Sequence, residues 1–186
     1  YKGMNIFTGY DANLPTQLWI AARYLEAVSL LIALLLITRR IRVGIIFLGY
    51  LLVTAFLVFL IFSRHFPDCY IEGSGLTSFK IFSEYIICLI LAGAMLLLSR
   101  KKTYFSPDIL YLLYGALIAT ICSELAFTSY VSVYGPSNFL GYILKIIAFA
   151  LIYQAIVVTG FQRPFEILYR DLSRNEKKYR ALFNTM

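Results

Sequence analysis

Residues 139–182 read FLGYILKIIAFALIYQAIVVTGFQRPFEILYRDLSRNEKKYRAL, a long apolar run followed by a strongly polar segment. Along the polar half, apolar side chains and one amide recur at alternating spacings of three and four residues: Phe165, Leu168, Leu172, Asn175, Tyr179 and Leu182. This is the heptad spacing of a helix that faces a partner in a left-handed coiled coil. The stretch therefore predicts a membrane span that continues into a linker helix over residues 161–182.

Three residues in this stretch are candidates for relaying a signal along it. Asn175 lies on the heptad seam, where a lone amide favours pairing with its counterpart in a second copy, so we expect a homodimer through the linker helix. Pro164 cannot donate a hydrogen bond to the carbonyl of Gly160, which predicts a kink or hinge at the junction. An alternative stays open, in which the amphipathic helix packs against its own bundle or lies on the lipid surface.

The composition indicates a membrane protein. Of 186 residues, 60% are hydrophobic and only 15% are charged, too few to cover a water-soluble domain of this size. Three cysteines without CxxC spacing predict neither a disulfide framework nor a zinc site. The chain opens with Tyr1 and no cleavable leader, so we expect it to be part of a longer protein.

Five apolar runs are long enough to cross about 30 Å of hydrocarbon as helices. We therefore predict an all-α, polytopic transmembrane bundle of five spans that ends in a cytoplasmic signalling helix. The predicted spans cover residues 16–38, 42–62, 79–99, 109–130 and 138–159.

Basic residues predict the orientation of the spans. If residues 39–42, 100–108 and 160 onward face the cytoplasm, that side carries twelve Lys and Arg, an excess typical of cytoplasmic loops. Residue 1 is then outside and the C-terminus inside, in a multi-pass protein of the cytoplasmic (inner) cell membrane. A basic cytoplasmic face favours contact with anionic lipids, and no nucleic-acid-binding module is recognisable. The bases assigned to the outside are Lys2, Arg64 and Lys80.

Five ionisable residues fall within the predicted spans, where each costs at least about 2.5 to 3.5 kcal/mol to insert and normally faces the bundle interior. At about 1.5 Å per residue, four of them lie at similar depth below the outer ends of their helices. The four are Arg23, Glu84, Glu124 and Lys145, and the fifth ionisable residue, Glu26, lies somewhat deeper. Helical spacing places Trp19, Asn138 and Tyr142 on the same faces, so we predict one charged layer that these residues share.

Two interpretations of this layer remain open. In the first, Arg23 and Lys145 neutralise the carboxylates as buried ion pairs that fix the order of the helices. In the second, the layer is a pocket for an unknown small molecule or ion, with one carboxylate left over for a cationic group or a proton. Proton sensing belongs to this second hypothesis, because a desolvated carboxylate beside other carboxylates holds a proton more readily.

Residues 64–75 form the main external loop and are expected to act as a lid over the charged layer. Their ionisable residues include His65, Asp68 and Glu72, but one His, one Cys and acids at irregular spacing give only a weak metal signal. We therefore predict no metal site. With a single histidine in the chain, a haem held by two of its histidines is excluded, and no cofactor is expected.

Four sequence blocks resemble one family and occur in its order. They include all five ionisable residues of the spans: YDANLPTQLWIAARYLE (10–26), FPDCYIEGSGLTSFKIFSEYII (66–87), SELAFTSYVSVYGPSNFLGYILKI (123–146) and GFQRPFEILYRDL (160–172). The family is the third type of membrane-associated sensor domain, in the MASE group. Its members are N-terminal input domains of bacterial and archaeal sensor histidine kinases or cyclic-dinucleotide enzymes such as diguanylate cyclases.

The resemblance implies a division of the chain into three parts. Residues 1–160 are expected to be a partial transmembrane sensor domain that lacks N-terminal spans, residues 161–182 a coiled-coil linker, and residues 176–186 the start of a PAS domain. No enzyme activity is expected within the chain itself. The resemblance supplies no ligand.

The sequence thus favours a sensory input module that detects an extracellular or membrane-dissolved signal and passes it through the last span to a cytoplasmic output. The alternative is a fragment of a secondary transporter or channel. It lacks support, because no span is broken by Pro or paired Gly near its midplane and no inverted repeat is visible. A membrane enzyme that uses Glu84 and Glu124 as acid and base ranks last, for want of a nucleophile or metal motif.

Overall fold

The computed structural model describes residues 13–37, 39, 42–71, 73–128, 136–157 and 160. Within them, five helices are long and apolar enough to cross a membrane, which confirms the predicted all-α, polytopic bundle. Their ends fall within three residues of the predicted ends. The helices are α1 (Asn13–Leu36), α2 (Val43–Phe62), α3 (Ser78–Arg100), α4 (Pro107–Thr128) and α5 (Pro136–Val157). Between them lie the short strands β1 (Tyr70–Ile71) and β2 (Gly75–Leu76) and the 3-10 turn η1 (Lys102–Tyr104).

Helix starts follow ordinary capping chemistry. Thr77 precedes α3, and its side chain accepts a hydrogen bond from the backbone N–H of Lys80 at 3.3 Å, satisfying a donor that has no partner inside the helix. Pro107 and Pro136 open α4 and α5, where the missing N–H costs nothing. Local sequence therefore fixes where three of the spans begin.

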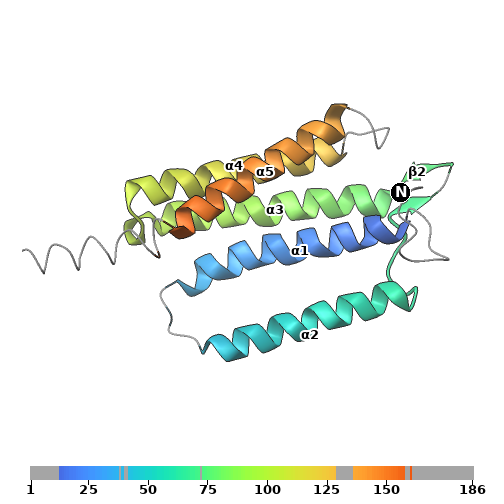
Figure 1. The fold of residues 1–186 in the computed structure, drawn as a ribbon, viewed down its shortest axis with the longest axis horizontal. Coiled ribbons are helices and arrows are strands. Elements are labelled where there is room, and N and C mark those ends of the chain that lie inside the picture. The colour runs from blue at the N-terminus through green and yellow to red at the C-terminus, as the bar shows by residue number, and fades with distance from the viewer. Residues whose placement is uncertain are drawn as a thin grey trace, which may run out of the picture.

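Four helices pack side by side, and α2 stands apart from them (Figure 1). Contacts run from α1 to α3, from α3 to α4, and most extensively from α4 to α5. Helix α2 touches α1 mainly near the strands, where Ile61 packs with Leu14 and Ala21. Most of the remaining α2 side chains are exposed. This is expected in a membrane, because lipid tails can cover an apolar helix as well as neighbouring helices can.

The bundle has an apolar half and a charged half. The main apolar core lies on α1, α3 and α4 and consists of Ala27, Leu34, Ile87, Leu91, Ala94, Leu98 and Leu117. The buried charges lie nearer the end that carries β1 and β2, which we call the hairpin end. The apolar core therefore supports the charged residues from one side.

The segment between α2 and α3 is fixed to the start of α1. The side-chain oxygen of Asn13 accepts hydrogen bonds from the backbone N–H groups of Cys69 and Tyr70, at 2.8 and 3.0 Å. The Gln17 amide donates to the carbonyls of Phe66 and Pro67, at 3.1 and 3.0 Å. A two-stranded hairpin follows, so this segment is an ordered cover on the hairpin end.

Helices α4 and α5 approach most closely at Gly141. The Ser123 hydroxyl donates to the Gly141 carbonyl at 2.8 Å, and a Cβ at Gly141 would lie 2.7 Å from two ring atoms of Phe127. The Phe127 side chain is buried and packed against other rings, so it cannot move away at low cost.

Gly141→Ala is therefore expected to lower the free energy of unfolding by about 1 to 3 kcal/mol through overpacking. Thermal unfolding in detergent micelles measures the change. Gly93→Ala is the matched control, because Gly93 is also helical and nothing lies within 4 Å of its added Cβ. Equal stabilities of the two variants would contradict the close approach of α4 and α5.

Candidate functional site

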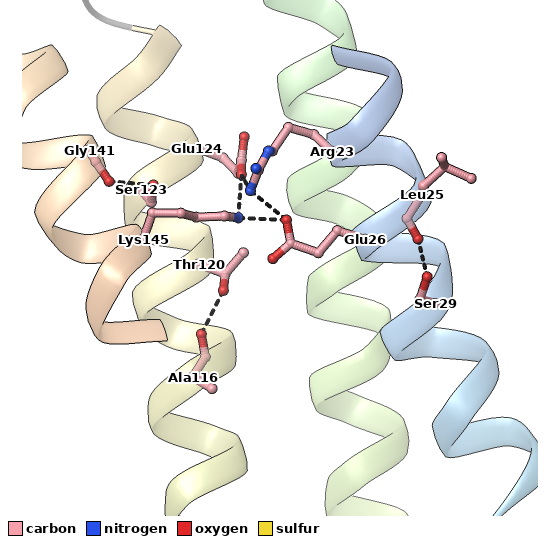
Figure 2. Close-up of polar contacts among 10 residues, drawn as sticks. All are labelled: Arg23, Leu25, Glu26, Ser29, Ala116, Thr120, Ser123, Glu124, Gly141 and Lys145. Carbon is pink, nitrogen blue, oxygen red and sulfur yellow. Dashed lines mark hydrogen bonds and ion pairs between the residues drawn. The ribbon is translucent and has the colours of Figure 1, made fainter. Parts of the chain in front are cut away.

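Four of the five predicted charged residues meet between three helices (Figure 2). Arg23 and Glu26 lie on α1, Glu124 on α4 and Lys145 on α5. Lys145 Nζ lies 2.8 Å from Glu26 Oε2 and 3.1 Å from Glu124 Oε1, so one ammonium bridges acids of two other helices. Arg23 Nη1 lies 2.5 Å from Glu26 Oε2 and 4.0 Å from Glu124 Oε1. We call these residues the charge cluster.

The charge cluster is shielded from its surroundings. The Glu124 and Lys145 side chains are 0% and 4% exposed, and those of Arg23 and Glu26 are 10% and 17% exposed. Each residue is placed by the period of its helix, since Arg23 and Glu26 are one turn apart on one face of α1. Buried charges persist only when they are paired, and here each cation contacts a carboxylate from another helix.

The fifth predicted residue, Glu84 on α3, pairs with Lys80, which the sequence analysis assigned to the outside. Lys80 Nζ lies 2.6 Å from Glu84 Oε1, and it donates a hydrogen bond to the Phe127 carbonyl at 2.7 Å. Lys80 is 1% exposed and Glu84 is 0% exposed. The prediction that counted Lys80 apart from the charges of the spans was therefore wrong, because an amine four residues before a buried carboxylate shares its helix face.

This correction changes the charge balance of the buried layer. With Lys80 included, three bases face three carboxylates among the described residues: Arg23, Lys80 and Lys145, against Glu26, Glu84 and Glu124. The expected surplus carboxylate is absent from this set. A surplus negative charge was the main electrostatic reason to expect a cation or a proton at this site, and the described residues do not supply it.

Aromatic rings line one side of the charge cluster. Trp19, Phe127 and Tyr142 meet edge to face, with centroid separations of 5.2 to 5.7 Å, and the Arg23 guanidinium lies 4.3 Å from the Trp19 ring centre. The sequence predicted Trp19 and Tyr142 on this layer but missed Phe127, which follows Glu124 by three residues on the same face. Asn138 is buried on the first turn of α5.

Five buried polar atoms have no hydrogen-bond partner within the described part of the chain. Four are carboxylate oxygens: Glu26 Oε1, both oxygens of Glu84, and Glu124 Oε2; the fifth is Arg23 Nε. Glu84 Oε1 is nevertheless partnered by charge, because it lies 2.6 Å from Lys80 Nζ, so the other four atoms are the ones left without a partner. An unpaired buried polar group costs about 1 to 3 kcal/mol, so these atoms favour a further binding partner.

Two of the three predicted lid residues are exposed, whereas the charge cluster is buried. His65 and Asp68 are exposed; His65 contacts the Ser63 hydroxyl, and Asp68 accepts a hydrogen bond from Asn13. Glu72 lies outside the described residues. No three potential metal ligands come together in the described ranges.

The thiol of Cys69 tests how tightly this cover is packed. Cys69 is 0% exposed, and burial raises the pKa of its thiol from 9.0 to about 12. The thiolate is the reactive form, so at pH 7 its population is about a thousandfold below that of an ordinary cysteine. We expect Cys69 to react at least about tenfold more slowly with a water-soluble maleimide than an introduced Ser74→Cys, since Ser74 is exposed. Mass spectrometry measures the two labelling rates, and equal rates would contradict the burial of Cys69.

A family model described as "membrane-associated sensor domain", MASE3, matches residues 1–164. The chain belongs to the MASE3 family. The resemblance drawn from the four sequence blocks is thereby confirmed. No curated protein and no solved structure matches the chain.

Membership identifies this chain as a membrane-associated sensor domain, which agrees with its five membrane-length helices. It is a multi-pass membrane protein, and a sensor domain is not itself catalytic. Of the predicted relay residues in this MASE3 domain, Gly160 is exposed. Pro164 and Asn175 lie outside the described residues, as do the predicted linker over 161–182 and the predicted PAS start over 176–186.

Proposed function

We propose that this MASE3 domain is the input module of a longer signalling protein. It detects an extracellular or membrane-dissolved signal at the charge cluster and passes it through α5 and the linker helix to a cytoplasmic PAS and kinase or cyclase output. The observation that carries the proposal is the position of Lys145, which lies on the last described helix and contacts carboxylates of α1 and α4.

Lys145 of α5 can form an ion pair with either of two acids, Glu26 or Glu124. A signal that competes for Glu26 or Glu124 changes which carboxylate holds the ammonium, and so changes the relative free energies of two arrangements of α5. A ligand shifts such an equilibrium only by its difference in affinity for the two arrangements. Because α5 leads directly to residue 160 and the predicted linker, a small rotation of this helix is a sufficient output.

The orientation and assembly follow from charge and heptad pattern. The excess of Lys and Arg in residues 39–42, 100–108 and 160 onward supports a cytoplasmic C-terminus in the inner membrane. The heptad seam with Asn175 supports a homodimer through the linker. The charge cluster then lies nearer the outer surface, within reach of external or lipid-dissolved molecules.

A transporter or channel fragment is the competing function. Transport sites typically form where helices are broken near the membrane midplane. Helices α1 to α5 run through their described lengths without such a break, which favours the sensor. A flux assay in liposomes separates the two, since a sensor leaves solute gradients intact.

The test uses Glu124→Gln in the full-length parent protein, assayed for the kinase or cyclase output that it carries. The change keeps the side-chain shape and removes the charge that Lys145 contacts, so we expect basal output to shift at least about threefold. Asp108→Asn is the matched control, the same acid-to-amide change at an exposed position of the same helix. Unchanged output from a normally folded Glu124→Gln protein would overturn the proposal.

A further inference from the structure

We propose that the charge cluster binds a neutral small molecule that both donates and accepts hydrogen bonds, such as one bearing hydroxyl or primary amide groups. This inference rests on the proposed sensory function and names the chemical class of its signal. It departs from the cation or proton that the sequence alone suggested.

The first argument is charge balance. Arg23, Lys80 and Lys145 match Glu26, Glu84 and Glu124 one for one among the described residues. An added ion of either sign leaves one charge unmatched at membrane depth, where each costs at least about 2.5 to 3.5 kcal/mol. A neutral ligand avoids this cost.

The second argument is the set of unpaired polar atoms. Within the charge cluster, Glu26 Oε1 and Glu124 Oε2 are buried and accept no hydrogen bond from the described residues. Arg23 Nε is an unpaired donor. An ammonium ion only donates and a carboxylate ion only accepts, whereas a hydroxyl or amide does both. The ligand class that meets these atoms is therefore neutral and bifunctional.

The third observation supplies a reporter. Trp19 is the only tryptophan of the chain, and its ring lies 4.3 Å from the Arg23 guanidinium and beside Phe127. A ligand that redirects Arg23 or the carboxylates alters the surroundings of this indole. Trp19 emission therefore reports occupancy without any added label.

The experiment titrates the full chain in lipid nanodiscs with three probes of similar size: acetamide, acetate and methylammonium. We expect a saturable change in Trp19 emission with acetamide alone. A saturable response to methylammonium or acetate but not to acetamide would overturn the proposal. No saturable response to any probe would also overturn it, since water alone then meets the unpaired atoms.

Charge-altering variants sharpen the test. Glu124→Gln leaves three bases against two acids, so the site should now respond to acetate. Lys145→Met leaves three acids against two bases and should respond to methylammonium. If Lys145→Met is too unstable to assay, Lys145→Gln replaces it, because it removes the same charge and keeps a side chain that can hydrogen-bond to the carboxylates. Variants that keep the wild-type response to acetamide alone would contradict the charge-balance argument.

A pH titration tests a bound proton as the competing signal. The groups facing Glu124 are Arg23 and Glu26 from α1, Lys80, Glu84 and Cys88 from α3, and Lys145 from α5. A neutral ligand requires the saturable response to acetamide to persist at both pH 6 and pH 8. A transition of Trp19 emission in this range that disappears in Glu124→Gln would replace the neutral ligand by a proton.

The two proposals fail separately. Acetamide binding together with an unchanged output of Glu124→Gln would leave the binding site standing and remove the sensory function. An altered output without acetamide binding would do the reverse.

Discussion

Lys80→Met is expected to destabilise the protein by about 3 to 5 kcal/mol, because it leaves the Glu84 carboxylate buried without its cation. The substitution also removes the hydrogen bond that Lys80 donates to the Phe127 carbonyl near the end of α4. The effect is large because Glu84 is 0% exposed and cannot turn to water. Unfolding in mixed detergent micelles, monitored by circular dichroism, measures it.

The double variant Lys80→Met, Glu84→Leu tests the cause. Removing both charges leaves no unpaired ion, so we expect most of the lost stability to return. Lys102→Met is the control for loss of a lysine, because Lys102 is exposed. A double variant as unstable as Lys80→Met would show that the packing of the lysine stem, not the ion pair, sets the stability.

Lys145→Met is the second change with a large expected effect, again about 3 to 5 kcal/mol. Lys145 contacts both Glu26 and Glu124, so its loss leaves two carboxylates with Arg23 as their nearest remaining cation. Adding Glu124→Gln restores a one-to-one balance of Arg23 with Glu26, and we expect it to recover at least half of the loss. The same unfolding assay measures both variants.

Tyr153→Phe controls for a change on the same helix, because Tyr153 is 70% exposed. We expect it to shift stability by less than about 0.5 kcal/mol. If Lys145→Met were equally mild, the ammonium would lie in water or lipid headgroups rather than between the two carboxylates.

The spans and the depth of the charged layer could be predicted from the sequence. Apolar run length fixes the helices within a few residues, because about 20 residues are needed to cross the hydrocarbon. The rise of 1.5 Å per residue then places Arg23, Glu124 and Lys145 at similar depth. Helical period supplies their faces, and these three residues do meet in the structure.

The partner of Glu84 could not be predicted in the same way. Lys80 stands three residues after the helix cap at Thr77, where a basic residue ordinarily reaches the headgroups, so it was counted with the bases outside. Its burial depends on Phe127, whose backbone carbonyl accepts the ammonium. A backbone acceptor carries no sequence signal. Only the i, i+4 spacing from Lys80 to Glu84 pointed to the pair.

The separation of α2 from the bundle was equally hidden. Its side chains are apolar on all faces, and lipid tails are as apolar as leucine, so the sequence cannot distinguish a lipid-facing side from a helix-facing one. The anchoring of the loop by Asn13 and Gln17 was also missed. Both residues bond backbone groups, and such contacts require the fold to bring distant segments together.

The central claim is that Lys145 of α5 and Glu26 of α1 interact directly inside the bundle. A double-mutant cycle with Glu26→Gln and Lys145→Met measures this interaction as the departure of the double variant's stability from additivity. The 2.8 Å contact predicts a coupling of about 2 kcal/mol. Additivity within about 0.5 kcal/mol would contradict it, and with it the charge cluster on which the proposed signalling depends.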